Sequence, residues 1–265
     1  MVSDRSFNGI SWNEMKEFLD EKHNLYNNPS FIENDPVSIP HRFEKLQDRE
    51  ISGFLTATIA WGRRDLILRG ANIMMEKMGD SPHSFITGAH DDEFDRFSDF
   101  VYRTFNGVDC ISFMRSLREI YKSHTSMEDI IAEGMSGDGE LTTGITHLRS
   151  RFFSGCHPAR SEKHFADITR GAAGKRLNMF IRWMVRSDNR GVDFGLWKRI
   201  SPSQLFIPLD FHSGNTARKL GLLTRKASDW KAVVELTEVL REFDPADPVR
   251  YDFSLFGLGV NENFR

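Results

Sequence analysis

The chain has few cysteines and no long apolar run, and these two absences exclude several classes of protein. Its 265 residues include only Cys110 and Cys156, which cannot build a disulfide framework or a four-cysteine metal site. The apolar stretches, such as 54–61, are much shorter than the roughly 18 residues of a membrane span. The first residues, MVSDRSFNGISW, hold no apolar signal segment. We therefore expect a cytoplasmic protein that does not enter a membrane.

The sequence also lacks the patterns of a β-protein and of a repeat protein. No stretch alternates polar and apolar residues over the length of a strand, and no segment repeats with a period of 20–50 residues. Hydrophobic residues make up 39% of the chain, which is enough for a packed core. Many segments place apolar residues at helical spacing. The predicted fold class is therefore all-α.

Helix signals divide the chain into short segments. A helix over 12–26 has Ser11 as its predicted N-cap, and the prolines in 34–41 favour extended backbone. Further helices are expected over the following ranges: 48–61, 64–78, 94–105, 110–121, 126–133, 141–153, 163–170, 175–186, 210–220, 228–243 with Ser228 as cap, and 247–256, stopped by Gly257 and Gly259. We expect one compact helical unit over 1–265 with two lobes. Residues 48–170 form the central lobe, and residues 1–47 plus 171–265 form the second.

Positive charge gathers in one third of the chain. The net charge is −3, yet residues 141–226 hold 16 Lys and Arg against 5 Asp and Glu, or +11, which leaves −14 for the remainder. A basic segment in an acidic protein indicates a polyanionic partner such as nucleic acid. The alternative is a solvated basic face without a ligand. Nothing in the sequence indicates an obligate protein partner.

The segment KHFADITRGAAGKRLNMFIRWMVR predicts two helices joined by a turn that contains glycine. Gly171 and Gly174 let the backbone approach a ligand closely, and the second helix presents free N–H groups that bind phosphate. Arg170, Lys175 and Arg176 flank the turn. The second helix has an apolar stripe, and we expect its other side, with Lys175, Arg182 and Arg186, to be basic; the stripe is Leu177, Phe180, Ile181 and Met184. A plain packing joint with incidental basic residues would have the same pattern.

A second polar motif, IPLDFHSGNTARKLGL, follows about 35 residues later. Asp210 stands where a helix begins, so its carboxylate is favoured by the helix dipole and by backbone N–H groups. An ordinary N-capping aspartate would have the same position. The motif alone leaves both interpretations open.

Together the two motifs resemble the helix-hairpin-helix base-excision DNA glycosylases, the endonuclease III superfamily. Their hairpin reads roughly G-x-G-x-K-x-x-N, and Gly171, Lys175 and Asn178 match it, with Ala173 in place of the second glycine. Their second motif, P-[VL]-D-x-H-x-x-R-[VLI]-A-x-[RK]-L-G, is matched by Pro208, Leu209, Asp210, His212, Ala217, Lys219, Leu220 and Gly221, with Asn215 at the arginine position. The resemblance covers 163–221 and gives Lys175 the place of the catalytic lysine and Asp210 that of the catalytic aspartate.

The chain departs from that superfamily in two further respects. The segment 187–207 lengthens the separation between lysine and aspartate, so archaeal 8-oxoguanine glycosylases are the closer match. No cysteine follows Cys156, so the iron–sulfur signature is absent and no cofactor is expected. The whole chain is also similar to an uncharacterised bacterial family, through DPVSIPHRF near its start and YDFSLFGLGV near its end.

The resemblance implies a base-excision mechanism. Lys175 would attack the sugar as a neutral amine and form a Schiff base, which permits strand cleavage. Neighbouring cations at Arg170 and Arg176 and partial burial would favour the neutral amine. Asp210 would stabilise positive charge on the sugar or orient the nucleophile. Lys175 could instead be a phosphate contact or a plain surface charge.

Several other residues are candidates for contact with DNA or with the extruded base. Trp61 and Trp183 offer rings for stacking, although each lies in an apolar helix where a core position is the alternative. Phe211 and His212 follow Asp210, and His212 suits a phosphate. Arg63 and Arg64 follow an apolar helix; solvated arginines are the alternative. No spacing favours zinc, and Asp188, Asp193 and Asp210 are too scattered for a metal cluster.

Three functions are therefore open. The first is a DNA glycosylase, with AP lyase activity, that excises a damaged base such as an oxidised purine. The second is a non-catalytic nucleic-acid-binding protein of the same fold, which the altered hairpin favours. The third is a helical protein that binds a nucleotide or phosphate in a basic cleft. The first requires the Lys175 amine and the Asp210 carboxylate to lie within several ångströms of each other.

Overall fold

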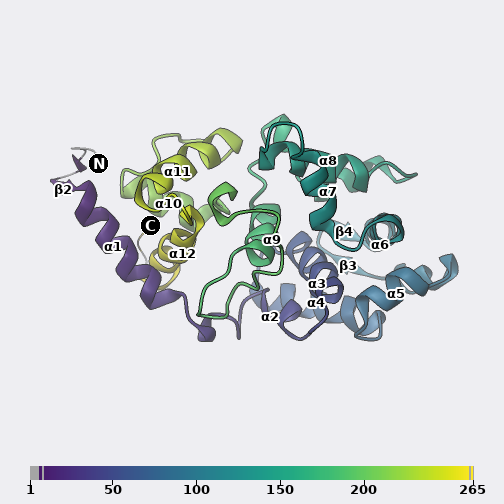
Figure 1. The fold of residues 1–265 in the computed structure, drawn as a ribbon. Coiled ribbons are helices and arrows are strands. Elements are labelled where there is room, and N and C mark those ends of the chain that lie inside the picture. Colours follow the sequence, from purple (N-terminus) through teal and green to yellow (C-terminus); the bar gives the residue numbers. More distant parts are fainter. Residues whose placement is uncertain (1–5, 8, 263, 265) are drawn as a thin grey trace. The chain divides into compact units, whose positions relative to one another are not determined.

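The computed structural model describes residues 6–7, 9–262 and 264, and it is predominantly helical (Figure 1). This confirms the all-α class. The strands of the described residues are limited to two short antiparallel hairpins. No helix among these residues is long and apolar enough to cross a membrane. Residues 1–5 and 8, which belong to the stretch considered for a signal segment, lie outside the described residues.

The chain forms two compact units. One combines residues 1–31 with 168–265, and we call it the terminal unit; the other spans 32–167, and we call it the central unit. The boundaries fall at 31/32 and 167/168, whereas the sequence suggested 47/48 and 170/171. Residues 32–47 therefore belong to the central unit.

The central unit packs its helices around phenylalanine rings. Phe54, Phe113, Phe152 and Phe165 contact one another with ring centroids 4.8–6.0 Å apart. Such tilted, edge-on and stacked ring contacts stabilise the core beyond the burial of their apolar area. The unit's elements are α2 (Ser38–His41), α3 (Leu46–Thr58), α4 (Arg64–Lys77), α5 (Pro82–Gly88), η2 (Asp91–Phe97), β3 (Val101–Tyr102), β4 (Phe105–Asn106), α6 (Gly107–Ser123), α7 (Met127–Gly134), α8 (Leu141–Phe152) and η3 (Ala159–His164).

Two predictions for the central unit are wrong. Residues 94–105 are not one helix: η2 ends at Phe97, and a β-hairpin follows whose turn residue Arg103 has φ of +53°, which no helix accommodates. Residues 34–41 are not extended, because they turn and enter α2. Pro40 is accommodated there because the first residues of a helix need no backbone N–H donor.

The terminal unit contains α1 and the last helices, which lie side by side in Figure 1 as α1 in purple and α12 in yellow. Its elements are β1 (Ser6–Phe7), β2 (Ile10–Ser11), α1 (Trp12–Tyr26), η1 (Pro29–Phe31), η4 (Ile168–Arg170), α9 (Lys175–Val185), η5 (Pro202–Gln204), α10 (Phe211–Lys219), α11 (Trp230–Phe243), η6 (Pro248–Tyr251) and α12 (Asp252–Asn261). Ser11 caps α1 as predicted, in a capping box with Glu14. The cap of α11 is Asp229, not Ser228.

The glycines of the last helix do not end it, contrary to the sequence prediction. Helix α12 runs through Gly257 and Gly259 to Asn261. A Cβ atom at Gly257 would lie 2.1 Å from the ring of Tyr26 on α1, and one at Gly259 would lie 3.0 Å from His212 on α10. These glycines therefore permit close packing of α12 against two other helices.

The segment 163–170 is also not the predicted α-helix. It contains the end of η3, an extended residue at Phe165 and the single turn η4. Phe165 is buried among the phenylalanines of the central unit, and its extended backbone interrupts the helix. The turn before α9 is therefore preceded by a short 3₁₀ turn, so the first helix of the expected hairpin is missing.

A buried histidine in the terminal unit predicts a pH-dependent stability. Burial, aided by the positive charge of Arg250, lowers the pKa of His23 from 6.5 to about 4. Its Nδ1 lies 2.9 Å from the carbonyl oxygen of Arg250 and its Nε2 lies 3.3 Å from the side-chain nitrogen of Asn27, so a neutral ring with the proton on Nδ1 satisfies both contacts.

Between pH 6.5 and 4 the unfolded chain binds a proton at this position that the folded protein does not. Lowering the pH through this window should therefore reduce the free energy of unfolding, by up to about 3 kcal/mol from this residue. His23→Gln should lose that part of the pH dependence, as measured by urea unfolding at pH 4.5 and 7. An unchanged pH dependence in the variant would contradict the assignment.

Candidate functional site

The turn before α9 contains two glycines in the left-handed backbone region. Gly171 has φ of +88° and Gly174, the N-cap of α9, has φ of +62°. The backbone N–H of Trp230 donates to the Gly171 carbonyl at 3.0 Å. The buried Asn178 places its side-chain nitrogen 3.4 Å from the Ala173 carbonyl, so it supports the turn from inside.

Lys175 and Asp210 are brought together in the terminal unit. Lys175 is the first residue of α9, and Asp210 is the N-cap of α10, where it accepts the backbone N–H of Ser213 at 2.7 Å. The Lys175 Nζ lies 3.6 Å from the Asp210 Oδ2. The lysine side chain is 35% exposed and the aspartate side chain 11%. A reagent can therefore approach an amine whose neighbour is a fixed carboxylate.

A second carboxyl group, which sequence reasoning missed, lies behind this pair. Asp252, the first residue of α12, accepts the Ser213 hydroxyl at 3.2 Å and forms an ion pair with Arg182 of α9. Burial raises the pKa of Asp252 to about 6, although the positive charge of Arg182 opposes the shift; the negative charge of Asp210 adds to it. One signal was available: Asp252 is the single acidic residue within the otherwise apolar segment 251–260.

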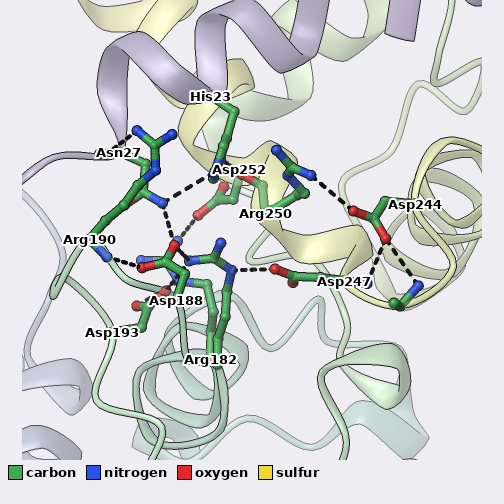
Figure 2. Close-up of polar contacts among 12 residues, drawn as sticks. His23, Asn27, Arg182, Asp188, Arg190, Asp193, Asp244, Asp247, Arg250 and Asp252 are labelled. Carbon is green, nitrogen blue, oxygen red and sulfur yellow. Dashed lines mark hydrogen bonds and ion pairs between the residues drawn. The ribbon is translucent and has the colours of Figure 1, made fainter.

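Two buried arginines, Arg182 on α9 and Arg186 at its C-cap, hold the surrounding elements by ion pairs. Figure 2 shows Arg182 and the aspartates around it. Arg182 contacts Asp193 at 3.3 Å and also binds Asp252. Arg186 contacts Asp193 at 3.1 Å, and it contacts both Asp188 and Asp247 at 2.8 Å. Both guanidinium groups lie over the ring of Phe253 on α12, at 4.5 and 5.5 Å from its centroid. The irregular segment after α9 and the start of α12 are thereby joined to one helix.

These ion pairs correct the prediction of a basic outer side on α9. Arg182 and Arg186 are 3% and 1% exposed, so their charges are neutralised inside the terminal unit. The excess of +11 in residues 141–226 therefore overstates the charge that a polyanion would meet. Arg176 is half-buried, and burial lowers its pKa to about 10.

The other candidates of the terminal unit differ in accessibility. Phe211 is 68% exposed at the start of α10, and Arg170 is exposed in η4. His212 is half-buried, with its ring 6.0 Å from that of Phe256. Trp183 is completely buried in α9, so the prediction that it stacks on a base is wrong; an apolar helix face was the better interpretation.

Trp61, Arg63 and Arg64 belong to the central unit. The ring of Trp61 is half-buried, lies edge-on to Tyr102 and stacks on His164. Arg63 is exposed and forms an ion pair with Asp65 at 2.7 Å, and Arg64 is exposed at the first position of α4. Their contacts with DNA stay predictions.

The acidic residues considered for a metal cluster have other partners. Asp188 and Asp193 both bind Arg186, and Asp210 contacts Lys175. Within the described part of the chain, no group of three or more His, Cys, Asp or Glu residues is arranged to hold a metal ion.

Comparison with known proteins shows the family of this chain. Residues 35–261 match the family described as "Protein of unknown function (DUF2400)", so the chain belongs to that family. The matched range includes Lys175, Asp210 and Asp252. No curated protein and no solved structure matches the chain.

The buried ion pairs predict a large loss of stability when one arginine is removed. Arg182→Met keeps the volume of the side chain but leaves Asp193 and Asp252 without one of their cations, so the free energy of unfolding should fall by about 3–5 kcal/mol. The matched control is Arg63→Met, which breaks an exposed ion pair and should leave stability unchanged. Urea unfolding of both variants measures the difference. Equal effects of the two substitutions would contradict a structural role for Arg182.

Proposed function

We propose that this member of the family is a DNA glycosylase with AP lyase activity, which excises a damaged base from DNA. The observation that carries the proposal is the 3.6 Å contact between the Lys175 amine and the Asp210 carboxylate, each at the first turn of a helix. The resemblance of both motifs to helix-hairpin-helix glycosylases supports the reaction class. The resemblance of the motif spacing to archaeal 8-oxoguanine glycosylases favours an oxidised purine as the damaged base.

Lys175 supplies the nucleophile. Once its ammonium has lost a proton, the amine attacks the sugar carbon that carries the base. The bond between sugar and base breaks, and the base leaves with the electron pair and takes up a proton. Opening of the sugar ring gives an imine between Lys175 and the sugar, from which β-elimination cleaves the strand. The 35% exposure of the lysine side chain leaves it accessible to an extruded nucleotide.

Asp210 supplies a fixed negative charge. Its carboxylate accepts the backbone N–H of Ser213 and lies at the positive end of the α10 dipole, so its orientation is fixed before substrate arrives. Positive charge develops on the sugar as the base departs, and a preorganised carboxylate stabilises it. The carboxylate also orients the Lys175 amine through the same contact.

The surroundings of the pair suit a nucleic-acid substrate. Gly171 and the exposed Arg170 precede α9, whose first backbone N–H groups are oriented for phosphate oxygens. Phe211 stands beside Asp210 and is 68% exposed, and an exposed ring there can stack on an unpaired base.

A non-catalytic nucleic-acid-binding protein is the second candidate function. The observations that favour it are Ala173 at the second glycine position and the 3₁₀ turn that stands where a first hairpin helix is expected. In that case Lys175 and Asp210 form an ordinary ion pair beside a phosphate contact.

The glycosylase proposal predicts a covalent adduct between Lys175 and DNA. An imine formed with an abasic site is made permanent by borohydride, so the wild type should give a shifted band on a denaturing gel. Lys175→Gln should give none. The matched control is Lys231→Gln, because Lys231 is an exposed lysine in the first turn of α11, and this variant should trap like the wild type.

Asp210→Asn separates base departure from imine formation. It should slow trapping on duplex containing 8-oxoguanine more than trapping on an abasic duplex, because only the first substrate still carries its base. Trapping by Lys175→Gln at the wild-type level would assign the nucleophile to another residue. No trapping by the wild type, with salt-sensitive DNA binding retained, would favour the non-catalytic protein.

Binding to DNA should weaken steeply with salt. Contacts between basic residues and phosphates release counterions, so the logarithm of the affinity should fall linearly with the logarithm of salt concentration. Arg170→Gln should reduce the slope by about one, as expected for one lost phosphate contact. Filter binding measures the affinity for DNA and its slope with salt. Salt concentrations from roughly 50 to 200 mM resolve such slopes. Absence of binding at low salt would contradict every nucleic-acid function.

A further inference from the structure

Ser213 joins the two carboxyl groups of the site. Its backbone N–H donates to Oδ1 of Asp210 at 2.7 Å, and its hydroxyl donates to Oδ1 of Asp252 at 3.2 Å. Ser213 is completely buried, so no water competes for either hydrogen bond. A change in the charge or position of the Asp252 carboxyl group can therefore shift the Asp210 carboxylate through Ser213 alone.

The other oxygen of Asp252 is bound from the opposite direction. Its Oδ2 forms an ion pair with Arg182, whose guanidinium also contacts Asp193 at 3.3 Å. The side chain of Asp252 is 11% exposed, so it lies deeper in the protein than Lys175 and contacts the site from its buried side. Its carboxyl group nevertheless interacts electrostatically with Lys175 and Asp210, as well as with Arg182.

We propose that Asp252 is a positioning residue of this site, which holds Ser213, and through Ser213 the Asp210 carboxylate, in place against Lys175. The role in catalysis rests on the proposed glycosylase function. The mechanical part, in which Asp252 orients Asp210, stands on the hydrogen bonds and the ion pair alone. The two parts can be tested separately.

The charge of Asp252 makes the positioning depend on pH. Burial raises the pKa of Asp252 to about 6, because transfer of a carboxylate out of water favours its neutral form. Above that pH the carboxylate binds both Arg182 and Ser213 as an anion. Below it the neutral acid is a weaker acceptor, so the hold on Ser213 loosens.

Other ionisable groups on the elements around α12 have partners of their own. His23 on α1 contacts the Phe253 ring, and Arg250 of η6 binds Asp244. Arg186, the C-cap of α9, binds Asp188, Asp193 and Asp247. Burial, again the largest cause, also raises the pKa of Asp247, which forms its ion pair with Arg186. A titration seen at Ser213 is therefore assigned by comparing the wild type with Asp252→Asn.

The amide proton of Ser213 reports on the proposed link without any substrate. In the wild type its NMR chemical shift should titrate with a midpoint near pH 6. In Asp252→Asn this titration should be absent, and the signal should lie upfield at pH 7.5 because the hydrogen bond to Asp210 is longer. Ser213→Ala keeps the amide and removes the hydroxyl. The change in the chemical shift of the residue 213 amide between low and high pH should therefore be at least halved. This second variant keeps the test decisive if Asp252→Asn does not fold.

The Ala232 amide is an internal control. It donates to the N-cap Asp229 at 3.1 Å, and a hydrogen bond from Arg225 holds the pKa of that aspartate far below its usual range. The chemical shift of the Ala232 amide should stay constant from pH 5 to 8 in the wild type and in both variants. A Ser213 amide that is constant in the wild type, or that titrates equally in Asp252→Asn, would overturn the proposal.

Kinetics test the catalytic part. The ratio of the wild-type rate of base excision to that of Asp252→Asn should fall below about pH 6 with KM unchanged, and above that pH the variant should be slower by roughly tenfold to a hundredfold, as for a misplaced catalytic group. The ratio cancels the loss of neutral Lys175 amine at low pH, which both proteins share. A rate and pH profile equal to those of the wild type would overturn the catalytic role. A titrating Ser213 amide in a wild type that traps no DNA would instead refute the glycosylase function and leave the link between the carboxyl groups intact.

Discussion

The arrangement of the helices in the terminal unit depends on the buried ion pair between Arg182 and Asp252. A guanidinium that is 3% exposed cannot lose its anion without a large desolvation cost, so α9, α12 and the segment with Asp193 must stay together. Lys175 precedes Arg182 by seven residues, which is two turns of the same helix. Both therefore lie on one face of α9, and holding Arg182 against α12 also aims Lys175 at α10.

The polar face of α9 is accessible at the N-terminal end of the helix and buried at its C-terminal end. Arg182 and Arg186 are enclosed by carboxylates and by the Phe253 ring, while Lys175 at the N-terminal end is 35% exposed. The buried end determines position and the accessible end is available for chemistry. This separation is what a reactive amine requires, because a nucleophile has to be held in place without being covered.

The sequence predicted those features that depend on local residues. The N-cap Ser11 of α1, the apolar stripe of α9 and the position of Asp210 at the start of a helix are encoded within a few positions, and the structure confirms them. The pairing of Lys175 with Asp210 was anticipated from the resemblance of two motifs. Two of the wrong predictions, by contrast, depend on partners distant in the chain. Arg182 was expected on an outer side because its anion Asp252 follows 70 residues later. Gly257 was read as a helix stop because the Tyr26 ring that requires a glycine belongs to α1.

The central claim is that the Lys175 amine reacts while Asp210 and Asp252 hold the site around it. Peptide mapping of the borohydride-reduced adduct with abasic DNA tests this most directly, because it locates the covalent bond on one side chain. The account predicts that, after proteolysis, mass spectrometry finds the remnant of the sugar on Lys175. A remnant on another residue, or spread over several exposed lysines, would contradict it.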